Sequence, residues 1–146
     1  MIQEIQTEVT NKVTKLVEKY EALEILKGTV LVELETLRQE IKTPLQGSIV
    51  MKKVCCHKKG CTTCGRTQNA HGPYPHLQWW DESGKLKTKY ISRKNLPIFE
   101  EQLKLSKKRI NRERLLIKIQ DRQHKIFLTM EGVLVRLNGK EVNQNV

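Results

Sequence analysis

Residues 2–41 read IQEIQTEVTNKVTKLVEKYEALEILKGTVLVELETLRQEI, with hydrophobic side chains at intervals of three and four. This spacing is the a/d pattern of a helix that packs along another helix. Lys27 fills the one gap, and two consecutive intervals of four indicate a stutter. The pattern predicts a helix over residues 1–42, about 60 Å long, that ends before Thr43-Pro44. The seam comprises Ile2, Ile5, Val9, Val13, Leu16, Tyr20, Leu23, Val30, Leu34, Leu37 and Ile41.

A second periodic segment predicts a helix over residues 97–137, with Asn95 as its N-cap. Its hydrophobic stripe slips in phase near Glu113. Asn138-Gly139 is a stop signal, which leaves residues 138–146 as a flexible tail. The stripe comprises Leu96, Phe99, Leu103, Ile110, Leu116, Ile119, Ile126, Met130, Val133 and Leu137.

The two helices have matched lengths and flank an insert, so we expect a long antiparallel helical hairpin, a coiled coil with the insert at its tip. Heptads alone leave open whether each helix pairs within the chain or with a second subunit. We expect a homodimer because a two-helix hairpin leaves much apolar surface uncovered. The remaining apolar side chains include Leu26, Leu31, Leu105, Leu115 and Ile117.

The insert, residues 43–96, predicts a small antiparallel β head. Strand patterns cover residues 48–54, 75–81 and 85–92, and Asp81-Glu82-Ser83-Gly84 predicts a hairpin turn between the last two. Three short strands supply a weak core, so a covalent or metal staple is expected. The predicted fold class is therefore α+β, a helical hairpin carrying a zinc-stabilised β head.

Four cysteines within ten positions indicate a metal site in the head. Cys61-x-x-Cys64-Gly has the spacing of a zinc knuckle, in which two thiolates reach one ion. Cys55 or Cys56 would supply a third ligand. The fourth would be the other of these two cysteines, His71 or His57. The predicted cofactor is structural Zn²⁺, held by members of the set Cys55, Cys56, Cys61, Cys64 and His71.

Other interpretations of the cysteines are a redox dithiol and inert thiols. The sequence offers no βαβ setting typical of a thioredoxin site. A catalytic zinc would need a nearby general base, yet the carboxylates of the head are confined to Asp81 and Glu82 in the turn. No carboxylate pair, Gly-rich phosphate loop or Ser/His/Asp set is recognisable, so we expect a protein that is not an enzyme.

The segment Val54 to Ser92 resembles a family of short, uncharacterised prokaryotic proteins, many of which look like products of mobile elements or plasmids. The resemblance rests on the cysteine cluster, then His71-Gly72-Pro73-Tyr74, then a β-hairpin with Lys89-Tyr90-Ile91. The family pattern is Cys-Gly-Lys-x-x-Cys-x-Cys, whereas here Cys56 precedes a histidine and two residues separate the last cysteines. The resemblance implies that His71 is a ligand.

The positive charge is concentrated in the head. The chain has a net charge of +11, and residues 44–96 carry 10 basic and 2 acidic side chains. Such a surplus favours a polyanionic partner, and we expect nucleic acid, specifically duplex DNA. The predicted contacts on the head are Lys52, Lys53, Lys58, Lys59, Arg66, Lys85, Lys87 and Lys89, with Lys108 and Arg112 on the second helix.

Each basic group has a plainer interpretation. Lysines at the last strand could protect a sheet edge, and Lys108 and Arg112 could be a solvated face paired with Glu18, Glu21 and Glu24 of the first helix. Trp79 and Trp80 should point to opposite faces, one into the core.

The expected function is therefore that of a cytoplasmic DNA-binding accessory protein with a coiled-coil arm for dimerisation or docking to a protein partner. The alternative is a protein-interaction module or chaperone-like clamp. Neither a secretory signal nor a membrane span is recognisable, and we expect no membrane partner.

Overall fold

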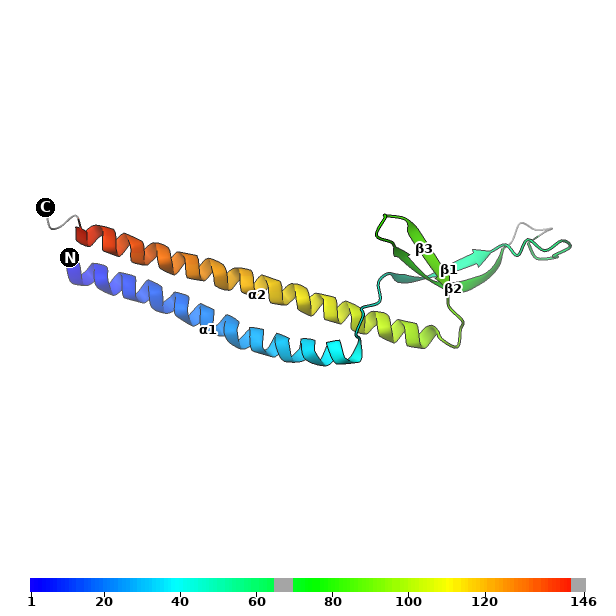
Figure 1. Ribbon diagram of the computed structural model, residues 1–146, viewed down its shortest axis with the longest axis horizontal. Helices are drawn as coiled ribbons and strands as arrows, with labels where there is room; N and C mark the ends of the chain where they lie inside the picture. The colour runs from blue at the N-terminus through cyan, green and yellow to red at the C-terminus, as the bar shows by residue number, and fades with distance from the viewer. Residues whose placement is uncertain (65–69, 143–146) are drawn as a thin grey trace. The chain divides into compact units, whose positions relative to one another are not determined.

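The structure is a computed structural model that describes residues 1–64 and 70–142, with residues 138–142 described by their backbone alone. Its elements follow the order α1 (Ile2–Glu40), β1 (Ser48–Val54), β2 (His71–Trp80), β3 (Leu86–Tyr90) and α2 (Leu96–Val142) (Figure 1). The α+β class predicted from the sequence is confirmed. Among the described residues, no helix is both long and apolar enough to cross a lipid bilayer.

The chain divides into two compact units. Met1–Leu37 and Asn111–Val146 form the first, called here the helical unit, and Arg38–Ile110 form the second, the head unit. Helix α2 contributes to both, and its predicted phase slip near Glu113 lies close to the division. The slip therefore marks where α2 changes the partner on which its apolar face packs.

The seam of α1 in the helical unit agrees with the predicted spacing from Val9 to Leu37. Every seam position from Val9 to Leu37 is buried or half-buried, including Lys27 at the gap, whereas Ile2 and Ile5 are exposed. Lys27 extends its ammonium group toward Glu24, 3.6 Å away. The core of this unit comprises Val30, Leu34 and Ile119, with Leu23, Leu115 and Leu116 packed against them.

Polar contacts show that α1 and α2 run antiparallel within the helical unit. Arg112 forms an ion pair with Glu33, and the Gln123 amide donates to the Glu24 carboxylate at 2.8 Å. Residue numbers thus rise along α2 as they fall along α1 (Figure 1). Gln123 fills a seam position that lacks an apolar residue, and its hydrogen bond satisfies an amide that is 6% exposed.

Both helices end at residues other than those predicted from the sequence. Helix α1 stops at Glu40, and α2 continues past Asn138-Gly139 to Val142, so the predicted stop was wrong. Residues 143–146 of the predicted tail lie outside the described residues. The turn that leads into α2 is capped by Ser92, whose Oγ accepts from the Asn95 N–H at 3.3 Å. A hydroxyl in this position satisfies a free N–H before the helix begins.

The head unit contains an antiparallel sheet in the order β1-β2-β3. β1 has its predicted bounds, β2 begins earlier than expected at His71, and β3 is shorter. The hairpin turn forms as predicted, with the Asp81 carboxylate accepting from the N–H groups of Ser83 and Lys85 at 3.0 and 2.8 Å. The Ser83 hydroxyl also donates to this carboxylate, at 2.7 Å, and it contributes most to holding the pKa of Asp81 below its usual value, followed by the Lys85 N–H.

One sheet face forms the core of the head unit. Leu77, Ile91 and Leu103 are buried together, and Trp79 packs against them from β2 while Phe99 does so from α2. Trp80 points the other way and is 66% exposed, which confirms the expectation for the adjacent tryptophans. The first turns of α2 therefore cover this face.

Arg109 and Ser106 fasten the segment after α1 to α2 within the head unit. Arg109 Nη1 donates to the carbonyl oxygens of Ile41 and Lys42 at 2.6 and 2.9 Å. Ser106 is fully buried, and its Oγ accepts from the Leu45 N–H at 2.8 Å. Carbonyl groups that follow a helix lack helical partners, so the guanidinium supplies the missing donor.

Candidate metal centre

The loop that connects β1 to β2 carries the cysteines. Antiparallel pairing sets Val54 opposite His71, so the chain enters the loop beside the residue that opens β2. Gly60 and His57 adopt positive φ angles of 80° and 52°, which allow the backbone to reverse. The Cys61 N–H donates to the Lys58 carbonyl at 3.3 Å and closes a tight turn. These features bring Cys61 back toward the start of β2.

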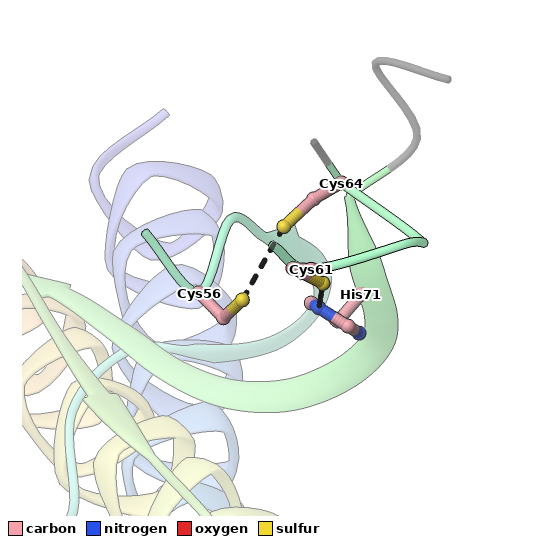
Figure 2. A group of neighbouring side chains, drawn as sticks. All are labelled: Cys56, Cys61, Cys64 and His71. Carbon is pink, nitrogen blue, oxygen red and sulfur yellow. Dashed lines mark hydrogen bonds between the residues drawn. The ribbon is translucent and has the colours of Figure 1, made fainter. Parts of the chain in front are cut away.

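Four side chains meet there. The three Sγ atoms of Cys56, Cys61 and Cys64 and a ring nitrogen of His71 all lie within 4.8 Å of one another (Figure 2). Cys56 Sγ is 3.3 Å from Cys64 Sγ, and Cys61 Sγ is 3.2 Å from His71 Nε2. All four residues are half-buried.

This arrangement fits a tetrahedral metal ion. Zinc bonds of about 2.3 Å to sulfur and 2.0 Å to nitrogen imply separations of about 3.5–3.8 Å between ligand atoms. These two separations fall slightly below this range, and the 4.8 Å limit lies above it. Small side-chain rotations would therefore complete a Cys₃His site, a donor set typical of structural zinc.

The electrostatics of the loop favour a thiolate at Cys61. Backbone N–H groups of Cys64 and Thr63 point at its sulfur and lower the pKa of Cys61 to about 6. At Cys56 the Lys58 backbone N–H acts to lower the pKa, but the hydrogen bond with Cys64 and desolvation outweigh it, so that pKa is raised. Amides aimed at sulfur are expected around a metal-bound thiolate.

Gly72, the residue after His71, lies where β2 closely approaches β1. Gly72 has a φ of +113°, and a Cβ added there would lie 2.9 Å from the Lys52 carbonyl oxygen. The close approach of β1 thus requires glycine next to the ligand.

The structure brings together four of the five predicted metal ligands. Cys55 is exposed, and neither it nor His57 belongs to the group of neighbouring donor atoms. Cys55 and Cys56 are consecutive residues directly after β1, yet Cys56 joins the group and the exposed Cys55 does not.

The basic residues predicted to contact nucleic acid lie on several different elements of the structure. Lys58 and Lys59 line a hollow beside the cluster together with Tyr74. Lys85 lies in the turn, and Lys87 extends toward Asp81, with 3.7 Å between Nζ and Oδ2. Arg66 lies outside the described residues. Lys52 and Lys53 belong to β1, Lys89 belongs to the edge strand β3, and Lys108 is exposed on α2.

Arg112 is paired with Glu33 rather than left open to a ligand. The plainer interpretation, an ion pair with the first helix, describes it better, although the partner differs from Glu18, Glu21 and Glu24. Sequence reasoning also missed the ring contacts of His76, and the structural role of Arg109. The alternation of Tyr74, His76 and Gln78 along one strand was the available signal.

Together, the fold and the cluster define a class of protein: an α+β chain with a Cys₃His group between two strands of a small sheet. The chain belongs to the family described as Domain of unknown function (DUF6788), whose model matches residues 6–101. The match includes most of α1, the whole sheet and the first residues of α2. Comparison with curated proteins and comparison with solved structures gave no match.

Proposed function

We propose that the protein is a non-enzymatic accessory protein that binds duplex DNA through the head unit, with a structural zinc ion holding the cysteine loop. The observation that carries the proposal is the positive charge of residues 44–96, which form most of the head unit. Residues 44–96 have 10 basic and 2 acidic side chains, and both acids, Asp81 and Glu82, lie in one turn. A duplex attracts such a surface through its phosphates, whatever its sequence.

The zinc ion would contribute by ordering the basic loop. Lys58 and Lys59 lie between Cys56 and Cys61, so a metal that joins these two cysteines fixes the backbone that carries both lysines. Ordering them before DNA arrives lowers the entropy lost on binding. The metal therefore supports binding without taking part in chemistry.

The helical unit would act as a coiled-coil arm for dimerisation or for docking to a protein partner. Its outer surface supports this role, because several large apolar side chains remain exposed on it. They include Ile25, Val32, Ile117, Leu128 and Val135. The same proposal includes a cytoplasmic location. It also includes a gene carried by a mobile element or plasmid, as the resemblance implies.

Charge substitutions test the DNA contact. Replacing Lys85, Lys87 and Lys89 with Gln should weaken binding to all duplex sequences alike and flatten the log–log salt dependence by up to about 3 units, the mark of phosphate contacts. The matched control replaces Lys12, Lys15 and Lys19 of α1 with Gln, which removes the same charge outside the head.

The two triple variants distinguish whether DNA affinity depends on contacts made by the head unit or only on the net charge of the protein. If both weaken binding equally, the head has no special role. If neither affects binding but the head variant disrupts a protein complex, the protein clamp is the better description. The exposed apolar side chains of the helical unit are the observation that favours this second function.

A further inference from the structure

The sheet has a second face, opposite the one that packs on α2. Cross-strand pairs align His76 with Tyr90 and Trp80 with Leu86. Since side chains alternate along a strand, these residues point away from Leu77 and Trp79 in the core. Tyr74 and Lys52 are paired on the same outer side. This surface, Lys52, Tyr74, His76, Trp80, Leu86 and Tyr90, is called here the aromatic face.

Three of its rings form a connected group. Tyr90 meets Tyr74 and His76 edge-on, with ring centroids 6.2 and 5.7 Å apart. The His76 ring also contacts the Tyr74 carbonyl oxygen at 3.0 Å through Nδ1, which restrains its orientation. Nevertheless the Tyr90 side chain remains 55% exposed. Tyr74 and His76 are half-buried, so Tyr90 is the most open of the three rings.

The strands that carry the rings contain no acidic residue. Lys52 of β1 lies on the aromatic face, whereas Lys87 and Lys89 of β3 pair with Trp79 and Leu77 and therefore lie on the opposite face. At the end of the face nearest the metal cluster, Tyr74 lines a hollow with Lys58 and Lys59. Accessible aromatic rings beside Lys52, Lys58 and Lys59 are complementary to a ligand that has flat apolar groups on an anionic chain.

We propose that the aromatic face binds single-stranded DNA by stacking unpaired bases on Tyr74, Tyr90 and Trp80, with the phosphates against Lys52, Lys58 and Lys59. This inference rests on the proposed DNA-binding function and names a particular form of DNA. A blunt duplex keeps its bases stacked inside the helix and can use only the lysines. Single strands, or duplexes with unpaired segments, can use the rings as well.

Substitution of the rings tests the inference on the full-length, zinc-loaded protein. Tyr90→Leu and Trp80→Leu should each weaken binding of a short single-stranded oligonucleotide by about 5- to 150-fold, as expected for the loss of one stacked base. Binding of the blunt duplex of the same sequence should change less than about 2-fold, because its phosphate contacts do not involve these rings. Fluorescence anisotropy measures both affinities.

Three controls separate stacking from other effects. Phe127→Leu removes a 51% exposed ring from the helical unit and should leave both affinities unchanged. Tyr90→Phe keeps the ring and should retain most of the single-strand affinity. In the wild type, the oligonucleotide should quench tryptophan fluorescence, and Trp80→Leu should abolish most of that quenching. Unchanged circular dichroism would show that each variant folds.

The outcomes for the two proposals differ. Wild-type protein that binds the duplex but not the single strand would overturn this inference and leave the proposed function standing. Single-strand binding that survives Tyr90→Leu and Trp80→Leu would also overturn it. Tighter binding to RNA of the same sequence would contradict the choice of DNA. Protein that binds neither form at low salt would contradict both proposals.

Discussion

At the scale of single residues, the surroundings of Cys61 give the strongest indication of a metal site in the head unit. Two backbone N–H groups, from Cys64 and Thr63, stabilise its thiolate and lower its pKa to about 6. Its sulfur also contacts His71 at 3.2 Å. A thiol in these surroundings readily loses its proton to solvent, and the resulting thiolate can bind a metal ion.

Removing this ligand should remove the metal. Protein purified without chelator should contain about one zinc per chain, and Cys61→Ser should lose it, together with the sheet signal, while the helical content largely persists. The helical unit has its own core of Val30, Leu34 and Ile119, which explains the persistence. Elemental analysis and circular dichroism measure the two effects.

Cys55→Ser is the matched control, because Cys55 is exposed and lies outside the group of neighbouring donor atoms. It should retain the full zinc content. A wild-type protein without zinc or iron, or a loss of metal in Cys55→Ser equal to that in Cys61→Ser, would contradict the assignment of Cys56, Cys61, Cys64 and His71.

The same residue predicts a pH dependence. After chelation, alkylation of Cys61 should rise with pH through about 6, because the thiolate is the reactive form and its fraction grows as pH passes the pKa. Below that pH, protons compete with the metal, so zinc should bind progressively more weakly. Mass spectrometry of the alkylated protein follows the first effect. A midpoint above pH 8 would show that the backbone amides do not stabilise the thiolate.

At the scale of elements, burial in the helical unit predicts which substitutions matter. Leu34 of α1 is fully buried, so Leu34→Ala should lower the free energy of unfolding by about 2–5 kcal/mol. Ile2 begins the same helix and is 66% exposed, and Ile2→Ala should change the free energy of unfolding by less than about 0.5 kcal/mol. Chemical denaturation at one protein concentration measures both, and equal effects would contradict the seam.

The seam was predictable because its signal is local. The three/four spacing from Val9 to Leu37 identifies the positions that are buried, and Lys27 is half-buried at the one gap. The last turns were not predictable: Asn138-Gly139 resembles a stop, yet α2 continues to Val142. Helix ends depend on small differences between local propensities, which a periodic pattern does not contain.

The sequence predicted a metal centre made of cysteines and histidine, but not which of the candidate residues belong to it. Cys61-x-x-Cys64 fixes two ligands through spacing alone, whereas the choice among Cys55, Cys56 and His71 depends on how β1 and β2 pair. The edge-on contact of Tyr90 with His76 depends on a second register, that of β2 with β3. Strand register links residues far apart in the sequence, so no local pattern reveals it.

At the scale of the whole molecule, self-association is the prediction that the exposed apolar residues support. Ile25 and Val32 are seven residues apart on α1 and therefore share a face away from the seam. Covering such faces with a second copy should give a homodimer at micromolar concentration, which sedimentation velocity can detect. Ile25→Glu with Val32→Glu should shift the equilibrium toward monomer, and a monomeric wild type would contradict the prediction.

Binding of DNA by the basic head is measured most directly as the affinity of the zinc-loaded protein for duplex DNA across a range of salt concentrations. The charge of residues 44–96 predicts displacement of about six condensed counterions, which gives a log–log slope near −5. Binding that falls steeply in this way, and equally for unrelated sequences, is the expected result. No detectable binding at low salt, or an affinity independent of salt, would contradict the account.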